Sequence, residues 1–419
     1  MNYSEIIAQL FQASASRGVH FGLKHSVQFD EQLGHPTRHY RTIHVAGSNG
    51  KGSVSLKIAK ALEYAGYNVG LYTSPHLSSF RERIVVNSEP IDEASVVEGM
   101  QEIFALESKL GIQASFFELT TFLAFEYFRK KLVEFAVIET GLGGKFDATN
   151  IILPVCSVIT SISREHAHIL GHDLETIASE KAGIIKSHVP LVLGSQARLQ
   201  SIYARAKELE APVYISKKIS QFFDEENSAV ARLALEVIAI TSLEHLPAIV
   251  PQEALEKALV CRPPCRLEQI GEVIFDVAHN PDAIFHLLQA LHTLHPNRKF
   301  RFLVGFSEDK EYDSCLELIA DVATHIHLVQ ASLSRAAPIE KLAQTLHEMR
   351  SETPFTQHET IDEGMRSAYQ AASEEQELLI VTGSFYLMAD TKAALGIQLI
   401  RDPYELNEKT LVPLTSKSS

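Results

Sequence analysis

The sequence has no apolar run long enough to cross a membrane. Nowhere do its 419 residues approach the roughly 20 consecutive apolar residues that a spanning helix needs. The first residues, MNYSEIIAQLF, also lack the basic start and the uninterrupted apolar stretch of a secretory signal peptide. We therefore expect a cytoplasmic protein without a membrane partner.

Cysteine and positive charge are also scarce. Four cysteines are too few for a disulfide framework in a chain of this length, and no two of them form a CxxC unit. Lys and Arg number 38 against 52 Asp and Glu, which gives a formal net charge of −14. A nucleic-acid-binding protein needs a basic face that displaces counterions, so we expect no nucleic-acid partner. An anionic substrate must instead be held by a few local cations, helix N-termini or metal ions.

The chain is too long for one ordinary core, and its patterns indicate two α/β domains. From residue 42, short β-branched runs alternate with helical patterns, which predicts a mainly parallel sheet with crossover helices. Pro263 and Pro264 interrupt a helical pattern, and a new strand and helix alternation follows them. We therefore predict an N-terminal domain over residues 1–262 and a smaller, doubly wound domain over 263–419.

The expected strands come from runs of β-branched and aromatic residues between turn signals. In the first half they cover residues 42–46, 69–73, 135–139, 155–160, 190–194 and 212–215. In the second half they cover residues 273–276, 300–305, 325–330 and 378–383. Apolar residues at helical spacing from Val96 to Leu110, behind a capping residue at Asp92, predict a helix.

The strongest local motif is IHVAGSNGKGS, at residues 43–53. A strand, a glycine-rich turn and a helix in this order present backbone N–H groups and a positive helix end to phosphate oxygens. We expect Lys51 to reach the β- and γ-phosphates and Ser53 to help hold a magnesium ion. The spacing is tighter than in the usual G-x-x-x-x-G-K-[ST] motif, because Gly47 lies only three residues before Gly50. The alternative is a glycine-rich surface turn.

Three further polar segments follow predicted strands: TSPHL at 73–77, ETGLGGKFDATN at 139–150 and SISREHAH at 161–168. The carboxyl ends of parallel strands meet at one edge of a sheet, where ligands bind. Their hydroxyl, carboxylate and imidazole groups suit a partial shell for a divalent ion that also bridges ATP. Glu139 closes a buried strand, where an unpartnered carboxylate is costly, and this favours a functional role.

These segments, followed by FDVAHNPDA at 275–283, occur in an order that resembles folylpolyglutamate synthase and dihydrofolate synthase, the folate branch of the Mur ligase superfamily. The resemblance extends from about Phe21 to Leu387. It implies an N-terminal P-loop-type ATPase domain and a smaller C-terminal Rossmann-like domain, with ATP and the pterin substrate in the cleft between them.

The resemblance also implies roles for individual residues. The implied ATP contacts are Asn49, Gly50, Lys51, Gly52, Ser53, Asn227, Arg266 and Asp276. The implied magnesium ligands are Ser74, Glu139 and His166, and the implied pterin contacts are Phe21, Gly22, Ser115, Phe146, Asp147 and Ala148. Lys181 matches a lysine that is carbamylated in such enzymes, where the added carboxylate ligates a second magnesium ion. The sequence is equally compatible with an unmodified lysine. Lys51, Lys181 and His166 are the implied catalytic residues.

The implied reaction is an ATP- and magnesium-dependent amide ligation. It joins L-glutamate to dihydropteroate, to folate glutamates, or to both. A carboxylate is a poor electrophile, so its oxygen first attacks the γ-phosphorus while Lys51 and magnesium neutralise the developing charge. The amine of glutamate then attacks the acyl phosphate. We expect small-molecule partners only, and a monomer.

Five positions depart from the family pattern. Lys145 stands where the family usually has Arg, and Phe146 stands where it has Leu. Glu165 replaces an Asp, Ser48 replaces a Thr and Cys265 replaces a Gly. Lysine lacks the planar, bidentate recognition of anions that arginine provides. These changes leave the phosphate-binding residues intact, and they leave open which pterin acid is preferred.

Three alternatives compete with this interpretation. A cell-wall Mur ligase usually has an additional N-terminal domain, and here the phosphate loop begins only about 45 residues into the sequence. A phosphate-loop kinase or GTPase would need no second domain that carries DVAHNP. A nucleotide-binding scaffold without activity is disfavoured by the presence of Lys51, Glu139, His166 and Lys181.

Overall fold

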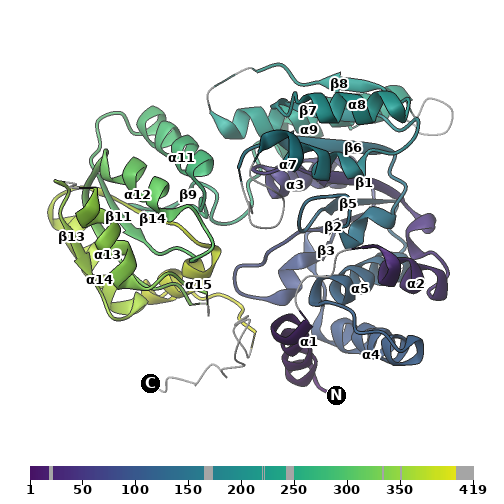
Figure 1. Cartoon of the computed structure of the whole chain (residues 1–419), viewed down its shortest axis with the longest axis horizontal. Helices are drawn as coiled ribbons and strands as arrows, with labels where there is room; N and C mark the ends of the chain where they lie inside the picture. Colours follow the sequence, from purple (N-terminus) through teal and green to yellow (C-terminus); the bar gives the residue numbers. More distant parts are fainter. Residues whose placement is uncertain are drawn as a thin grey trace. The chain divides into compact units, whose positions relative to one another are not determined.

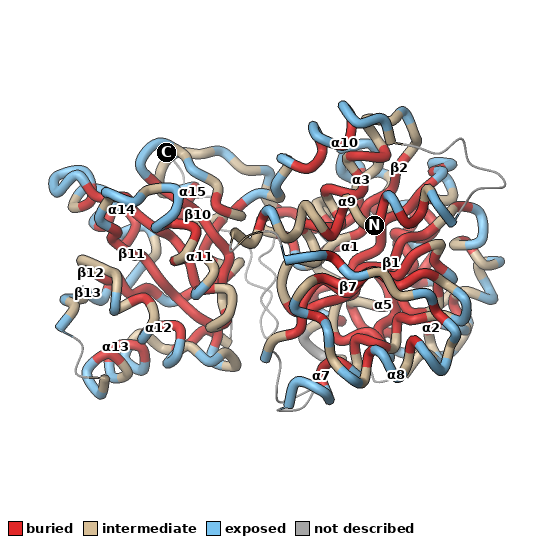
Figure 2. The backbone as a smooth tube through the Cα atoms, turned by 90° about the horizontal axis from the view of Figure 1, so that it is seen from above, coloured by how far each residue is buried: buried red, intermediate tan, exposed pale blue. Residues whose placement is uncertain are grey.

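The computed structural model describes residues 1–17, 22–164, 173–218, 220, 222–241, 250–332, 335–349 and 352–402. These residues form two compact units (Figure 1). The first contains Met1–His76 and Phe80–Pro263, and the second contains Leu77–Ser79 and the described residues from Pro264 onward. Each unit has its own sheet, and Figure 2 shows that buried residues follow the strands of both. The predicted α/β fold class is confirmed.

The first unit has an eight-stranded sheet of order β4-β3-β2-β5-β1-β6-β7-β8. Its strands are β1 (Arg41–Ala46), β2 (Val69–Tyr72), β3 (Ile84–Val86), β4 (Glu89–Pro90), β5 (Phe135–Glu139), β6 (Cys156–Ser161), β7 (Leu191–Gln196) and β8 (Val213–Ile215). The strands from β2 to β8 in that order pair in parallel, while β3 and β4 pair antiparallel. The carboxyl ends of the central strands therefore share one edge.

The helices of the first unit cover both faces of this sheet. They are α1 (Tyr3–Arg17), α2 (Lys24–Gln32), α3 (Lys51–Tyr64), α4 (Glu93–Leu110), α5 (Phe116–Lys130), α7 (Leu174–Lys181), α8 (Gln200–Glu208), α9 (Phe223–Thr241) and α10 (Gln252–Leu259). Short 3-10 helices occur at η1 (Pro36–His39), η2 (Phe80–Arg83), η3 (Ala148–Ile151) and η4 (Ala182–Ile184).

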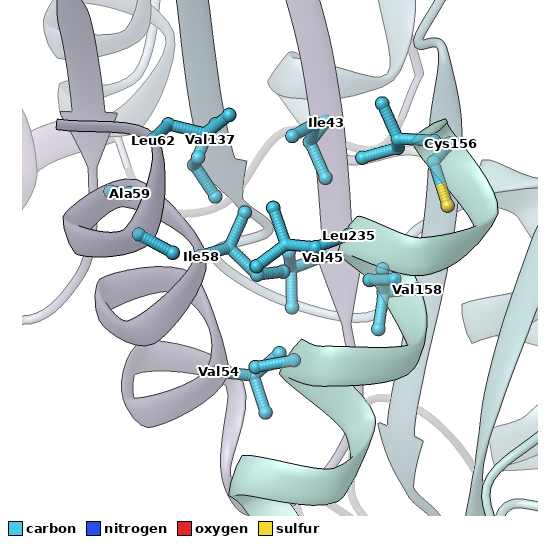
Figure 3. Packing of buried hydrophobic residues seen from close by; sticks show 14 of the residues in the cluster. Ile43, Val45, Val54, Ile58, Ala59, Leu62, Val137, Cys156, Val158 and Leu235 are labelled. Carbon is cyan, nitrogen blue, oxygen red and sulfur yellow. The ribbon is translucent and has the colours of Figure 1, made fainter. Parts of the chain in front are cut away.

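The core of the first unit fixes the helix that follows the phosphate loop (Figure 3). Alternation along β1 sends Ile43 and Val45 to one face of the sheet. Val54 and Ile58, four residues apart on α3, meet them there, together with Leu235 of α9. Each such buried aliphatic side chain contributes roughly 1.5 to 3 kcal/mol of transfer free energy, so α3 is held firmly over the end of β1.

A buried lysine joins α3 to the end of the first unit. Lys57 is fully buried, and its Nζ donates to the carbonyl oxygens of Leu259 and Cys261. It also lies 3.0 Å from a carboxylate oxygen of Asp224, which pairs in turn with Arg262 at 2.8 Å. Burial lowers the pKa of Lys57, and Asp224 partly offsets that effect. The last residues before Pro263 are thus tied to the helix that follows the phosphate loop.

The strands predicted in the first unit are confirmed, with ends that differ by one or two residues. The helix predicted behind Asp92 is α4, and the Asp92 side chain accepts a hydrogen bond of 2.8 Å from the backbone N–H of Ser95. The β3 and β4 hairpin was not predicted, because its strands are two or three residues long. Asn87 and Ser88 form its turn with φ of 49° and 69°, values typical of a type I′ hairpin.

The second unit has a six-stranded sheet of order β13-β12-β11-β14-β10-β9. Its strands are β9 (Glu268–Ile270), β10 (Val273–Phe275), β11 (Phe300–Val304), β12 (Ala323–Leu328), β13 (Phe355–Gln357) and β14 (Leu378–Thr382). Its helices are α11 (Pro281–Leu294), α12 (Tyr312–Ala320), α13 (Ile339–Glu348), α14 (Ile361–Glu374) and α15 (Phe385–Ala394). The four strands predicted here are confirmed, with ends that differ by one or two residues, whereas the three-residue strands β9 and β13 were missed. None of the described helices has both the length and the apolar character that crossing a membrane requires.

Candidate active site

The phosphate loop lies between β1 and α3, as the sequence predicted. Gly47 has a φ of 149°, and Gly50, the N-cap of α3, has a φ of 85°. A Cβ at Gly47 would lie 1.9 Å from Oγ1 of Thr160, and a Cβ at Gly50 would lie 2.3 Å from Oδ1 of Asn227. Both positions therefore require glycine for space as well as for conformation. The same contact brings Asn227, an implied ATP contact, to the loop.

Hydroxyl groups at the end of β6 hold the phosphate loop in place. Thr160 Oγ1 donates to the carbonyl oxygen of Asn49 at 2.6 Å. Ser161 Oγ donates to the same oxygen at 3.0 Å and accepts from the N–H of Asn49 at 3.0 Å. Ser163 completes the contact, because its carbonyl oxygen accepts from Ser48 Oγ at 3.0 Å. Sequence reasoning treated residues 161–168 as ligands and missed this positioning role, for which the hydroxyl-rich run TSIS was the available signal.

Two lysines converge on one carbonyl group of the loop. Lys51 Nζ donates to the carbonyl oxygens of Gly47 and Ser48, at 2.9 and 3.0 Å. Lys181, at the end of α7, is 1% exposed, and its Nζ donates to the same Gly47 oxygen at 2.8 Å. Two of the implied catalytic residues are thus brought together, with their positive charge beside the loop. His166, the third, lies outside the described residues.

Glu139 lies next to the start of α3. It is 4% exposed at the end of β5, and its Oε2 accepts from the backbone N–H of Ser74 at 3.1 Å. A Cβ at Gly52 would lie 3.5 Å from that oxygen, so the first turn of α3 passes beside the carboxylate. The positive end of a helix stabilises a negative charge placed there.

This arrangement fits a divalent cation. Carboxylate and hydroxyl oxygens are the donors that magnesium and manganese prefer, and Glu139, Ser74 and Ser53 supply them. Within the described parts of the chain, no group of three or more His, Cys, Asp or Glu side chains is placed to hold a metal ion. Among the described residues, Glu139 is therefore joined by hydroxyl groups as candidate ligands, and His166 lies outside the described residues.

The loop after β5 is ordered around a buried carboxylate. Asp147 accepts from the N–H groups of Gly141, Leu142 and Thr149, at 2.8, 2.9 and 3.0 Å. Burial raises the pKa of Asp147, although these hydrogen bonds oppose the shift. Thr149 Oγ1 donates to Asp147, so it must accept from His44 Nε2, which lies 2.8 Å away. Burial, and secondarily Lys186, lower the pKa of His44 to about 3, which keeps this ring neutral.

The same loop is attached to the segment that carries Lys181. The N–H of Lys145 donates to the carbonyl oxygen of Glu180 at 2.8 Å, and Asn150 Nδ2 donates to that of Gly183 at 3.1 Å. A Cβ at Gly183 would lie 2.3 Å from the Cα of Lys145, so the two backbones are in direct contact. The loop and Lys181 are therefore positioned as one piece.

The implied pterin contacts differ in how far their side chains are exposed. Phe146 is 42% exposed, with Nζ of Lys145 5.0 Å from its ring centre, while Ala148 is buried. Ser115 is the N-cap of α5 and forms a capping box with Glu118. Gly22 has a φ of 122°, and Phe21 lies outside the described residues. The side chains of Ser115 and Asp147 thus bond within the protein, and Phe146 offers an open aromatic ring.

The second unit contains the other two implied nucleotide contacts. The guanidinium carbon of Arg266 lies 4.9 Å from the ring centre of Phe385. Asp276, directly after β10, accepts from the N–H groups of Leu267 and Ala278, at 2.8 and 2.9 Å. Burial raises the pKa of Asp276, and the charge of Arg266 opposes that shift. Arg266 and Asp276 are therefore close to each other.

Two domain families match the chain in the order of its two units. Residues 45–221 match the Mur ligase middle domain, and residues 265–385 match the Mur ligase glutamate ligase domain. The chain is 32% identical to a dihydrofolate synthase/folylpolyglutamate synthase of Bacillus subtilis, over 90% of this chain and 96% of that protein. It is 31% identical to a folylpolyglutamate synthase of Lacticaseibacillus casei, over 94% of this chain and 99% of that protein.

Solved structures agree with these matches. A bifunctional folylpolyglutamate synthase/dihydrofolate synthase of Yersinia pestis, complexed with AMPPNP and a Mn ion, superimposes with a TM-score of 0.85 at 29% identity, covering 94% of this chain and 98% of that one. A Mycobacterium tuberculosis folylpolyglutamate synthase, complexed with ADP and AMPPCP, gives a TM-score of 0.83 at 26% identity, covering 94% and 100%. This chain therefore belongs to the dihydrofolate synthase/folylpolyglutamate synthase family, within the Mur ligases.

Proposed function

We propose that this chain is an ATP-dependent ligase that joins L-glutamate to dihydropteroate, to folate glutamates, or to both, through an acyl phosphate. The observation that carries the proposal is the convergence of Lys51 and Lys181 on the Gly47 carbonyl, at the same sheet edge as Glu139. Cations beside a glycine loop suit a triphosphate, and a buried carboxylate nearby suits the accompanying metal ion. The names of the relatives support the same reaction.

In this proposal ATP is held by the loop residues Asn49, Gly50, Lys51, Gly52 and Ser53, with Asn227 beside them. Arg266 and Asp276 of the second unit contribute further nucleotide contacts. The complexes of relatives with ADP, AMPPNP and AMPPCP support the binding of an adenine nucleotide. The first N–H groups of α3 have no acceptor within the helix itself, so they suit phosphate oxygens as donors.

Ser74, Glu139 and His166 are the proposed ligands of a divalent cation, and the Mn ion in the complex of the Yersinia relative supports a divalent cation as such. When bound, such a cation supplies Lewis-acid stabilisation of charge on the γ-phosphate. We further propose a second magnesium ion with Lys181 as its carbamate ligand. The amine of Lys181 would release the Gly47 oxygen and add to CO2 with loss of a proton, which ¹³C NMR after addition of labelled bicarbonate can detect.

The chemical steps follow from the positions of the chain's own groups. Lys51 neutralises charge on the transferring phosphoryl group while a carboxylate oxygen of the pterin acid attacks in line. Phe146, in the loop after β5, presents a flat apolar surface for the pterin acid. The other proposed contacts are Phe21, Gly22, Ser115, Asp147 and Ala148. The amine of glutamate then displaces phosphate from the acyl phosphate, which forms the amide.

The direct test is ADP formation in the presence and absence of each substrate. We expect it to require both a pterin acid and glutamate, and we expect Lys51→Ala to lower it by at least about 100-fold, because the charge on the transferring group loses its partner. Lys60→Ala, on a half-buried lysine of the same helix, is the matched control and should behave like the wild type. ATP consumption that is indifferent to both substrates would contradict the proposal.

Mass spectrometry of the products formed with each acceptor would decide between dihydropteroate and folate glutamates. We also propose that the enzyme acts in the cytoplasm as a monomer, without nucleic-acid or membrane partners. The net charge of −14 supports the absence of nucleic acid. Sedimentation of the purified protein tests the monomer.

A further inference from the structure

Two non-glycine residues with left-handed backbone flank Arg266. Cys265 has a φ of 55° and Leu267 has a φ of 48°, and we call these three residues the Arg266 turn. Left-handed residues often follow helix C-caps, as Leu132 does after α5 and Gln376 after α14. The Arg266 turn follows no helix end, since α10 already ends at Leu259. Such conformations persist only where surrounding contacts determine them, and they concentrate at functional sites.

A part-buried ion pair contacts the backbone of Cys265. Glu268 Oε2 accepts from the backbone N–H of Cys265 at 2.7 Å and from Lys392 Nζ at 2.7 Å. Lys392 is 4% exposed and lies on α15, and its Nζ is 5.3 Å from the ring centre of Phe275. Removing the lysine would leave a half-buried carboxylate without its counter-charge, and that carboxylate would then hold the N–H of Cys265 less well.

Further bonds fix the rest of the turn. Asp276 accepts from the N–H of Leu267, and the N–H of Val277 donates to the carbonyl oxygen of Cys265 at 3.0 Å. Phe385, whose ring lies under the Arg266 guanidinium, is seven residues before Lys392 on α15, so both project from the same side of that helix. One helix thus supports the side chain of Arg266 and also the carboxylate that fixes its backbone.

We propose that Lys392 and Glu268 are positioning residues, which hold the Arg266 turn left-handed so that Arg266 is oriented toward the nucleotide phosphates. This inference rests on the proposed role of Arg266 in ATP binding. Without the ion pair, Cys265 can return to a negative φ, and the direction in which the chain presents Arg266 then changes. The roles concern orientation and not chemistry, because neither Lys392 nor Glu268 is assigned a contact with substrate.

The test uses Lys392→Met, which keeps the length and the apolar stem of the side chain while removing its charge. The measurement is kcat/KM for ATP in ADP formation that depends on glutamate, with a thermal unfolding curve for each variant. We expect Lys392→Met to fold and to lose roughly tenfold in kcat/KM, as expected when a strained conformation loses its support.

Rescue by glycine separates positioning from general stability. Glycine adopts a positive φ without penalty, so Cys265→Gly should restore most of the activity of Lys392→Met. Cys265→Ala in the same background is the matched control, because it also removes the thiol but keeps the Cβ, and it should not restore activity. In the wild-type background, Cys265→Gly should change kcat/KM little.

Two results would overturn the inference. One is a folded Lys392→Met variant with unchanged kcat/KM, and the other is an equal effect of Gly and Ala at position 265. If Lys392→Met does not fold, Glu268→Gln with the same pair at position 265 decides the question. Arg266→Ala distinguishes the two proposals. An unchanged kcat/KM for ATP in Arg266→Ala would contradict the proposed role of Arg266 itself. A lower kcat/KM in Arg266→Ala together with a normal kcat/KM in Lys392→Met would contradict only the positioning role.

Discussion

The phosphate loop of the first unit and the Arg266 turn of the second unit both contain residues with a positive φ, but different contacts stabilise that conformation in each. Both use positive φ to present charged groups that we assign to the nucleotide. In the phosphate loop the two positive φ values belong to Gly47 and Gly50, where a side chain has no room. In the Arg266 turn they belong to Cys265 and Leu267, which are buried and held by carboxylates. A turn built on glycine can be recognised in a sequence, and a turn held by distant partners cannot.

Among the variants of the two turns, we expect the largest effect for Gly47→Ala. The new Cβ would lie 1.9 Å from Oγ1 and 3.1 Å from Cβ of Thr160, so the loop or β6 must move. We expect ADP formation to fall by at least about 100-fold, since small displacements of catalytic groups have effects of this size. The free energy of unfolding should fall by about 3 kcal/mol, from strain and overpacking together.

Gly66→Ala is the control for Gly47→Ala. Gly66 also has a positive φ, of 93°, but no atom lies within 4 Å of the position that its Cβ would take. Only the conformational penalty remains there, so we expect about 1 kcal/mol of destabilisation and nearly normal activity. Equal losses of activity in the two variants, measured in the same assay, would show that space at Gly47 is unimportant.

A smaller effect is expected for Thr160→Val, which keeps the shape of the side chain but removes the hydroxyl that donates to Asn49 at 2.6 Å. The part-buried carbonyl oxygen of Asn49 then keeps only the donor from Ser161 Oγ, and losing one such hydrogen bond costs about 1 kcal/mol, so we expect KM for ATP to rise about fivefold. Thr160→Ser retains the hydroxyl and should stay within about twofold of the wild type. A normal KM in Thr160→Val would mean that the glycines alone determine the loop.

The smallest effect concerns pH, to which the two turns should respond differently. Hydroxyl groups hold the phosphate loop and do not titrate near neutrality, whereas Glu268 anchors the Arg266 turn. Burial raises the pKa of Glu268, but the bonds from Lys392 and from the Cys265 N–H outweigh it, and the net pKa lies below the ordinary value of 4.5. The folded state therefore favours the ionised carboxylate. Its contribution to stability is complete above pH 4.5 and is lost as the pH falls through the lower, folded pKa.

Glu268→Gln measures that contribution. At neutral pH the variant should be less stable than the wild type by about 1 kcal/mol, since the carboxylate is partly exposed to solvent. The difference in the free energy of unfolding should shrink as the pH falls below 4.5, while other titrating groups such as Asp276 cancel in the comparison. A difference that stays constant with pH would show that the ion pair does not hold the turn.

Much of the first unit was predictable, because its signals are local. The strands β1, β5 and β6, the loop glycines and the position of Glu139 all follow from periodicity and turn chemistry within about ten residues. The short strands β3, β9 and β13 give too little pattern to recognise. The role of Thr160 was missed because it acts on Asn49, 111 residues earlier in the chain.

The glycine loop between β1 and α3, to which we assign the phosphates, could be recognised from the amino-acid sequence alone, because the conformational freedom of glycine and the charge of Lys51 are properties of the residues themselves. The partners of each turn depend on the folded chain, since Lys181 reaches the Gly47 carbonyl across 134 residues and Lys392 reaches Glu268 across 124. Hydrogen bonds and ion pairs between distant segments depend on the packing that brings those segments together. No local pattern records that packing, and for this reason the anchors of the Arg266 turn emerge only from the folded chain.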